Sequence, residues 1–391
     1  MLENIEDESV AVSTTTQSVS SKFEISLKKR DFVRSLSHVQ SVVERKNIIP
    51  ILSHALISAR KGQIELTATD MDIVISEKIP ANIISEGEIT VSAGMIYEIA
   101  RKLDDDKEVL IKFDSTKSVA SIYSGNCKFH LSTLSVKDFP KLDDLNYKCS
   151  FKIGVASFKL LLDQCKFAIS ADETRYNLNG IYMQHHDSCI RLVATDGHRL
   201  SVASSPVIEG LQEFTSVIIP KKTVLEIRKI IDEAEGDINI SISDNKVKFY
   251  NNNFSLTSKL IDAKFPNYEN LIPQNNDIVL EMSSKNFSVA VDRVSTITNE
   301  KFRGIELVVD GNVLAISSNS EIGGTAKEEI EIQNNHSSKL EVGFNARYVL
   351  EVMTVIKGED VLLSFKDPFA PAIIKEKGNK NFQYIIMPMR V

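Results

Sequence analysis

Hydrophobic and polar residues follow one pattern three times along the chain. Each copy opens with the apolar–polar alternation of a strand, crosses two or three polar residues, and then changes to helical spacing. The opening segments are "FEISLKKRDFVRSLSHVQSVV" from Phe23, "FKIGVASFKLLLDQCKFAIS" from Phe151 and "IVLEMSSKNFSVAVDRVSTIT" from Ile278. In the second copy, Phe158, Leu161 and Leu162 fall on one helical face. The pattern predicts a strand and then an amphipathic helix at the start of each copy.

Two further features recur within each copy. An alternating segment with a polar turn comes first: "IELTATDMDIVIS", "IRLVATDGHRLSV" and "NVLAISSNSEIGG". A second strand–helix pair follows it: "EITVSAGMIYEIARKL", "SVIIPKKTVLEIRKII" and "LEVGFNARYVLEVMTVI". Asp70 and Asp196 are 126 positions apart, and Phe23 and Phe151 are 128 apart. The repeat unit is therefore about 125 residues long, which is an ordinary domain size.

These elements predict the fold class. Long alternating strands joined by polar turns favour antiparallel sheets, and two amphipathic helices per unit would bury their apolar stripes against them. The stretches "DFPKLDDLNYK" and "FPNYENLIPQNND" close the first two units. We predict an α+β fold of three tandem similar domains at residues 22–147, 148–274 and 275–391. Residues 1–21 are acidic, then rich in Ser and Thr, and predict a disordered tail.

Composition narrows the class of protein. The chain has 391 residues, of which 42% are hydrophobic and 25% charged, as in ordinary globular domains. It has no apolar run near the ~20 residues of a membrane-spanning helix, and the first 21 residues lack the features of a signal peptide or presequence. The four cysteines form no CxxC pair, so we expect reduced thiols, a cytoplasmic location, and neither a metal site nor a cofactor.

The charge pattern leaves a nucleic-acid partner open. The net charge is −7, but partners respond to local fields. Basic residues cluster around predicted helices, at Lys28, Lys29, Arg30, Arg34, Arg101 and Lys102, and again at Lys221, Lys222, Arg228 and Lys229. Acidic residues gather in the tail, around Asp105 and around Glu328. We expect a basic helical face and an acidic outer surface; the alternative is the solvated face of any amphipathic helix.

The stretch "LVATDGHRLSV", from Leu192 to Val202, concentrates candidate chemistry. Asp196, His198 and Arg199 could serve as acid, base and anion clamp in a hydrolase or metalloenzyme. As structure, Thr-Asp-Gly is a typical hairpin turn. The matching stretches "ATDMDI" and "SSNSEI" lack the histidine, and the chain contains neither HExxH nor GxSxG. We favour the turn. For "HHDSC", at 185–189, we favour a solvated loop over a metal site because no complementary ligand pair accompanies it.

Five motifs carry a family resemblance. In order they are "ETRYNLNGIYM", "LVATDGHRLSV", "TSKLIDAKFPNY", "TNEKFRGIEL" and the terminal "YIIMPMRV". They resemble those of the β subunits of bacterial DNA polymerase III, the sliding clamps, and the likeness runs from Phe23 to Val391. It implies the DNA clamp fold and a ring-shaped, head-to-tail homodimer around double-stranded DNA, contacted without sequence specificity. It also implies a processivity factor without catalysis, no membrane contact, and three kinds of partner: the replicative polymerase α subunit, the clamp loader and other proteins with a clamp-binding motif. A chromosomal scaffold that does not encircle DNA is a further alternative.

The resemblance also assigns sites by position. The implied partner-peptide pocket comprises Leu178, Thr195, Gly197, His198, Arg199, Leu200, Pro266, Leu271, Asn345, Tyr348, Met387, Pro388, Met389 and Arg390. The implied DNA-facing residues are Lys46, Arg101, Arg175, Tyr176, Lys221 and Lys222. The implied dimer interface contains Phe129, Thr296 and Ile297. Apolar Leu, Met and Pro side chains beside Asn, His and Arg would suit a short peptide.

Two departures from the family pattern bear on these sites. A basic residue often follows the family's "FPDY", whereas this chain has Glu269 and Asn270. A second aromatic residue often follows the Tyr of "RYYLNG", whereas this chain has Asn177. We therefore expect a less positive pocket rim and the loss of one stacking or phosphate contact.

Overall fold

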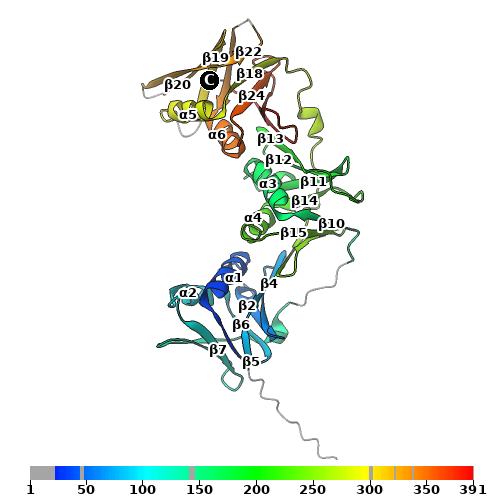
Figure 1. The fold of residues 1–391 in the computed structure, drawn as a ribbon, viewed down its shortest axis with the longest axis vertical. Coiled ribbons are helices and arrows are strands. Elements are labelled where there is room, and N and C mark those ends of the chain that lie inside the picture. Colours follow the sequence, from blue (N-terminus) through cyan, green and yellow to red (C-terminus); the bar gives the residue numbers. More distant parts are fainter. Residues whose placement is uncertain are drawn as a thin grey trace, which may run out of the picture. The chain divides into compact units, whose positions relative to one another are not determined.

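The computed structural model describes residues 23–44, 48–140, 146–298, 303–320, 323–336 and 339–390. It divides into two compact units, one of residues 1–68 and 78–140 and the other of residues 69–77 and 141–391. The predicted tail at 1–21 lies outside the described residues. Figure 1 shows helices and sheets alternating along the chain in each unit.

The first unit contains two helices and two groups of strands. The helices are α1 (Lys29–Val42) and α2 (Ala93–Lys102). A five-stranded antiparallel sheet has the order β5-β1-β7-β8-β9. Its strands are β1 (Phe23–Lys28), β5 (Asn82–Ser85), β7 (Glu108–Asp114), β8 (Val119–Ser124) and β9 (Cys127–Ser132). In the other group, β2 (His54–Arg60) pairs with β3 (Gln63–Thr69) on one side and with β6 (Gly87–Ser92) on the other.

The second unit begins with another repeat of the same elements. The helices are α3 (Val155–Cys165) and α4 (Lys221–Ile230). One group of strands has the order β10-β15-β16-β17-β4. Its bounds are β10 (Cys149–Gly154), β15 (Asp237–Ile242), β16 (Lys246–Tyr250), β17 (Phe254–Lys259) and β4 (Ile73–Pro80). The other group is β11 (Gly180–His186), β12 (Cys189–Thr195), β13 (Arg199–Ser204) and β14 (Val217–Pro220).

A further repeat completes the second unit. Its helices are α5 (Ser284–Ser295) and α6 (Ala346–Val355). A four-stranded sheet, β21-β20-β19-β23, contains β19 (Gly304–Asp310), β20 (Val313–Asn319), β21 (Thr325–Glu331) and β23 (Leu340–Asn345). The remaining strands are β18 (Ile278–Ser283), β22 (Gln333–Asn334), β24 (Asp360–Phe365), β25 (Ala372–Glu376) and β26 (Phe382–Ile386). Together with β11, β12, β13 and β14 they form one nine-stranded sheet, because β26 pairs with β13.

The six predicted strand–helix pairs are confirmed, with one correction. Each helix begins at the residue after its strand, as at Lys28 and Lys29, so the polar residues expected as a connection form the first helical turn instead. Side chains cap two of these turns: the Ser283 hydroxyl accepts from the Asn286 N–H, and the Asn345 amide oxygen accepts from the Arg347 N–H. Such caps satisfy N–H groups that have no partner within the helix.

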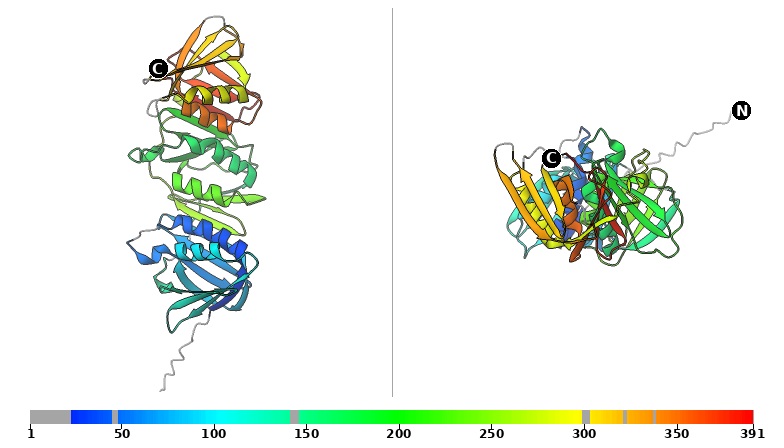
Figure 2. Two further views of the ribbon diagram at one scale, coloured as in Figure 1. Left: turned by 90° about the vertical axis from the view of Figure 1, so that its left-hand side faces the viewer. Right: turned by 90° about the horizontal axis from the view of Figure 1, so that it is seen from above.

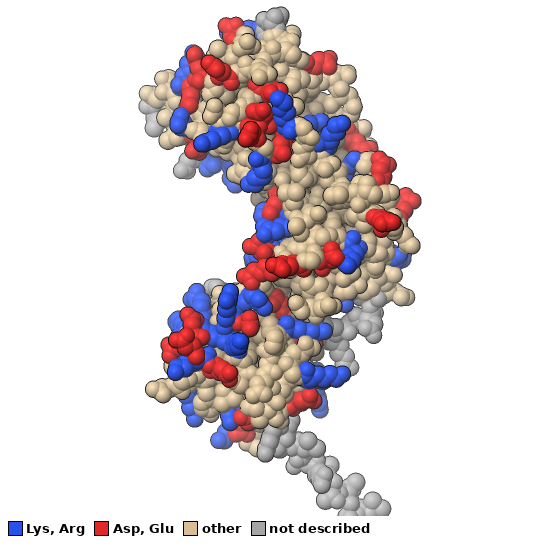
Figure 3. Space-filling view, in the orientation of Figure 1, with Lys and Arg blue, Asp and Glu red and all other residues tan. Residues whose placement is uncertain are grey.

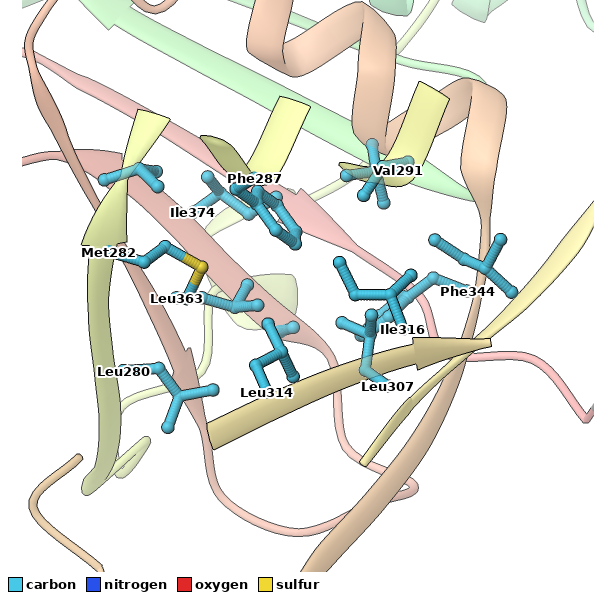
Figure 4. Packing of buried hydrophobic residues seen from close by; sticks show 14 of the residues in the cluster. Leu280, Met282, Phe287, Val291, Leu307, Leu314, Ile316, Phe344, Leu363 and Ile374 are labelled. Carbon is cyan, nitrogen blue, oxygen red and sulfur yellow. The ribbon is translucent and has the colours of Figure 1, made fainter. Parts of the chain in front are cut away.

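Apolar packing holds each helix pair against its sheet. In the last repeat, Phe287 and Val291 of α5 are fully buried over Leu280, Leu307 and Ile316 of the strands (Figure 4). Their spacing of four residues places them on one helical face, as the sequence pattern predicts. The two helices of each repeat lie side by side (Figure 2). Burial of a large apolar side chain contributes about 1.5–3 kcal/mol, so these faces account for much of the stability of each repeat.

An ionic network ties α3 to α4. The Arg228 guanidinium of α4 donates two hydrogen bonds to the Asp163 carboxylate of α3, at 2.8 Å and 2.9 Å. Lys166 also reaches Asp163, at 2.6 Å. Burial of Asp163 favours its neutral form, but the hydrogen bonds from Arg228 and Lys166 outweigh burial and lower its pKa. The bidentate geometry makes this pair stronger than a single surface ion pair.

This network predicts a pH-dependent stability. Because the pKa of Asp163 is depressed in the folded chain, its stabilising effect is present above the unfolded pKa, about 3.9, and is lost as pH falls through the folded value. Asp163→Asn should lower the free energy of unfolding by roughly 1 kcal/mol at pH 7, allowing for partial exposure. In a pH series of thermal melts, the gap to the wild type should close below about pH 4. Asp244→Asn, which removes an exposed pair with Lys148, is the control. A gap that is independent of pH would contradict this account.

Candidate partner-binding groove

The predicted turn between β12 and β13 is confirmed in atomic detail. The Asp196 carboxylate accepts hydrogen bonds from the N–H groups of His198 and Arg199, at 2.9 Å and 3.1 Å. The Thr195 hydroxyl donates to the Arg199 carbonyl and accepts from the Gly197 N–H. Gly197 has a φ of 90°, a conformation that other residues rarely adopt. Asp196 thus shapes the backbone, which leaves the His198 ring exposed at the tip.

The C-terminal segment of the last repeat lies between this turn and strand β23. Strand β26 pairs antiparallel with β13, and the Met387 N–H then donates to the His198 carbonyl at 2.9 Å. Two residues further on, the Met389 N–H donates to the Gly343 carbonyl at the same distance. Backbone hydrogen bonds therefore fix the segment 387–389 between the second and third repeats.

An apolar cluster underlies the predicted pocket. It contains Leu178, Val193, Leu200, Val202, Ile218, Phe265, Tyr268, Ile373 and Ile385. Leu178 and Leu200 are buried in it, so they form a floor and not an exposed wall. Leu271 and Met387 remain 48% and 43% exposed. Each lies within two residues of a cluster member or of Ile272, which packs against the cluster. They offer accessible apolar surface at its edge, and Pro266 is also exposed there.

One rim of the pocket is a stacked pair of rings. The His198 imidazole and the Tyr348 phenol of α6 have centroids 6.0 Å apart and planes inclined by 19°. Burial, followed by the nearby Asp196 charge, raises the pKa of Tyr348, so the phenol is neutral and can donate a hydrogen bond. We use the name groove for the predicted pocket residues that remain accessible or form this ring pair: His198, Leu271, Tyr348 and residues 387–390.

Arg199 occupies a different place from an anion clamp. Its side chain is only 7% exposed and lies between the Phe167 and Tyr348 rings, 5.2 Å and 4.6 Å from their centroids. It forms ion pairs with Asp196 and with Glu351 of α6. The expected role of Arg199 in orienting a ligand therefore has no support in its surroundings, which are those of a buried cross-link. Asn345, also predicted for the pocket, caps α6 with its side chain.

A cavity of about 550 Å³ adjoins the last predicted residues. Pro388, Met389 and Arg390 line it together with Phe369, which is 81% exposed. The Asp367 carboxylate holds the Phe369 turn by accepting from the Phe369 and Ala370 N–H groups. Sequence reasoning missed Phe369. An aromatic residue in the polar, proline-bounded turn "DPFAP" is a signal that could have identified it.

The two departures from the family pattern have visible partners. The Glu269 carboxylate lies 3.9 Å from the Arg191 guanidinium, so the added negative charge is partly compensated. The Asn177 amide donates to the Lys264 carbonyl at 3.5 Å, in place of an aromatic ring.

The residues considered as the catalytic or metal-binding groups of a hydrolase or metalloenzyme have structural surroundings instead. Asp196 is engaged by its own turn and by Arg199. The "HHDSC" segment forms a tight hairpin, with Asp187 and Ser188 at positive φ between β11 and β12. Within the described residues, no three His, Cys, Asp or Glu side chains come together as a metal-binding group. Burial raises the pKa of the Cys165 thiol to about 12, so it is no ready nucleophile.

The predicted DNA-facing residues fall into separate places. In the second unit, Arg175 and the exposed Tyr176 adjoin α4, because the Lys221 N–H donates to the Asn179 carbonyl. Arg175 forms an ion pair with Asp172, and Lys222 with Asp70, at 3.0 Å and 2.5 Å. In the first unit, Arg101 pairs with Glu98. Lys46 lies outside the described residues.

The expected separation of basic and acidic surfaces does not hold at two of the acidic segments. Lys29, at the start of α1, lies 2.7 Å from Asp105, a member of the acidic segment expected elsewhere. Arg293 of α5 similarly pairs with Glu328. Figure 3 shows Lys and Arg interspersed with Asp and Glu on the visible face. The cause is local: helix ends and the strands beside them bring opposite charges within reach.

Of the predicted dimer residues, Phe129 lies on an edge strand. Phe129 is on β9, the last strand of the five-stranded sheet. Thr296 and Ile297 follow α5 directly, and the neighbouring sheet ends in β21.

None of the helices that the structure describes is long and apolar enough to cross a membrane.

Comparison with known proteins assigns the family. Family models of the DNA polymerase III beta subunit match residues 22–143 as its N-terminal domain, 152–267 as its central domain and 269–390 as its C-terminal domain. The beta sliding clamp of Rickettsia bellii is 40% identical over 374 residues, covering 93% of this chain and 98% of that protein. The clamp of Caulobacter vibrioides is 37% identical over 371 residues, covering 94% and 100%.

Solved structures agree with these matches. The DnaN sliding clamp of Bartonella birtlesii, bound to griselimycin, superposes with a TM-score of 0.90 at 39% identity, covering 95% of this chain and all of that one. The Caulobacter crescentus clamp gives a TM-score of 0.91 at 36% identity and the same coverage. The predicted fold of three tandem clamp domains is confirmed. The chain belongs to the DNA polymerase III beta subunit family, the beta sliding clamps.

Proposed function

We propose that this chain, a DNA polymerase processivity clamp, holds partner proteins through the groove while a ring of two copies encircles double-stranded DNA. Its role is to tether and involves no catalysis. The observation that carries the proposal is the exposed apolar side chain of Met387, whose N–H donates to the carbonyl of His198, the residue that stacks on Tyr348. Exposed Leu271 adds apolar surface next to Ile272, which packs on the apolar cluster below. The hydrolase alternative finds no support in the family to which the chain belongs.

The groove suits a short peptide with bulky apolar residues. Two such anchors contribute about 1.5–3 kcal/mol each, and the ordering of a flexible peptide offsets part of this gain. A micromolar affinity follows, which allows partners to exchange. The proposed partners are the replicative polymerase α subunit, the clamp loader and other proteins with a clamp-binding motif. Phe369 and the adjoining cavity extend the apolar surface beyond Pro388.

The proposed DNA contact is electrostatic and independent of sequence. Arg175, Tyr176 and Lys221 form one site on the second unit, and Arg101 is assigned to the same role on the first. Phosphate contacts of this kind position a duplex without reading its bases. The role places the protein in the cytoplasm, where bacterial DNA is replicated.

The proposed dimer joins unlike edges of two copies. Strand β9, which carries Phe129, would meet the region of Thr296, Ile297 and β21 of the partner copy. Pairing would satisfy edge N–H and C=O groups and bury the apolar side chains behind them. Such head-to-tail contacts close a ring when two copies suffice. We also propose that the three domains of the chain are residues 22–147, 148–274 and 275–391.

The groove predicts a selective loss of partner binding. Leu271→Asp places a charge on an exposed apolar anchor and should weaken binding at least tenfold, with little effect on folding. The measurement is fluorescence anisotropy with a labelled peptide containing a glutamine and two bulky apolar residues. Val207→Asp, at another exposed apolar position, is the matched control. Equal affinity for both variants and the wild type would count against the groove.

The dimer interface predicts a dissociation phenotype. Phe129→Asp combined with Ile297→Asp would bury two carboxylates in the proposed interface, which is strongly unfavourable. We expect a folded monomer near the chain mass of 43.6 kDa in analytical ultracentrifugation, and loss of retention on circular DNA. Val207→Asp should remain dimeric. A dimer of the double variant at micromolar concentration would show that the interface is elsewhere.

The DNA contact predicts a change in salt dependence. Arg175→Ala with Lys221→Ala removes two cations near Tyr176, so retention on nicked circular DNA should fall at lower salt than for the wild type. Lys246→Ala, on β16, is the control for a general loss of positive charge. An unchanged salt profile of the double variant, measured with intact dimers, would contradict the assignment.

A further inference from the structure

We propose that Glu351 is a positioning residue for the groove: it holds Arg199 and Arg347 and thereby fixes Tyr348 against His198. This inference rests on the proposed function of the groove in peptide binding. It concerns a side chain outside the set of predicted pocket residues, and it assigns Arg199 an indirect role.

The contacts of Glu351 span two repeats. One carboxylate oxygen accepts from the Arg199 Nη1 group of β13, and the other accepts from Arg347 Nε of α6 at 2.8 Å. The side chain is 27% exposed, which limits competition from water. A single carboxylate therefore joins the strand that follows the 195–199 turn to the helix that carries Tyr348.

Arg199 is committed to protein partners at each of its nitrogens. Its Nε donates to Asp196 at 3.1 Å and its Nη2 donates to the Phe167 carbonyl at 2.6 Å, while Nη1 reaches Glu351. The planar guanidinium also lies over the Tyr348 ring. A buried cation with this set of partners orders its surroundings, because moving any partner leaves a charge or a carbonyl unsatisfied.

The contacts of Glu351 and Arg199 restrict the position of the Tyr348 ring. It precedes Glu351 by three positions on α6, so both side chains lie on one helical face. The Arg199 guanidinium lies over the Tyr348 ring, and the His198 imidazole stacks with the same ring. Without Glu351, Arg199 keeps Asp196 as its one carboxylate partner among the described residues and gains freedom to turn toward solvent. The ring pair at the groove rim would then lose its fixed geometry.

Other cross-links keep the two repeats together when Glu351 is replaced. The Gln164 amide of α3 donates to the Val355 carbonyl at 3.2 Å, and the Tyr384 hydroxyl donates to the Gln164 side-chain oxygen. The β13–β26 ladder also remains. A variant at Glu351 should therefore fold, and its defect should be confined to the groove.

The experiment compares Glu351→Ala, Glu351→Gln and the control Glu281→Ala. Glu281 has a similar exposure, 22%, and pairs with Lys377 in the same repeat. We expect Glu351→Ala to weaken peptide binding about tenfold, equal to ~1.4 kcal/mol, and Glu281→Ala to stay within about twofold. Glu351→Gln retains acceptor oxygen and should recover part of the affinity. Thermal melts confirm that each variant is folded.

A double-mutant cycle with Arg199→Ala tests the route of the effect. If Glu351 acts through Arg199, the double variant should bind no worse than Arg199→Ala alone, whereas independent effects would add. A second readout needs no ligand: in ¹H–¹³C spectra of histidine-labelled protein, the His198 ring signal should lose the shift due to Tyr348 in Glu351→Ala but not in Glu281→Ala.

These readouts separate two failures. Wild-type affinity and an unchanged His198 signal in both Glu351 variants would overturn the positioning role. Additive losses in the cycle would also overturn it. If the wild-type chain binds no peptide, the proposed function of the groove fails, and the His198 signal still decides whether Glu351 fixes the ring pair.

Discussion

The pairing of β13 with β26 is the constraint on which the groove depends. These strands come from different repeats, and their ladder makes one continuous sheet from β14 to β22. Because the ladder fixes register, residues before β13 and after β26 meet at a defined place: the His198 carbonyl accepts from the Met387 N–H. A slip by one residue would turn every side chain to the opposite face. The apolar cluster below the pocket therefore contains residues of both repeats, among them Leu200 and Ile385.

The second unit uses the same turn twice, with different results. Asp70 accepts from the Asp72 and Ile73 N–H groups, as Asp196 does from the two residues that follow Gly197. Strand β4 then pairs with β17, as β13 pairs with β26. The first turn directs its carboxylate to Lys222, whereas the second directs an arginine to Glu351. In both places the turn leads into a strand that pairs with a strand distant in the sequence, and the histidine after Gly197 adds a ring that can face a ligand.

Periodicity made the elements predictable, because burial of one face imposes a spacing that survives in the sequence. The six strand–helix pairs and the 195–199 turn could be located in this way. Partners of charged groups could not. Glu351 lies 152 positions from Arg199, and Lys29 lies 76 from Asp105, and no local pattern specifies which pairs will meet. Exposed Phe369 is a different case: the turn "DPFAP" marks it as an exposed aromatic residue, but only the structure shows that it lines a cavity with Pro388.

Charge compensation on the helices has a consequence for sliding. Arg228, Lys166 and Lys222 each have a carboxylate partner within the second unit. A phosphate that approaches such a cation must compete with that partner, so each contact is weaker than one made by an isolated Lys or Arg. Weak, replaceable contacts hold a duplex without fixing it at one position. Of these three cations only Lys222 belongs to the predicted DNA-facing set, so under the proposed function the ion pair that holds Lys222 at Asp70 would also weaken its contact with a phosphate.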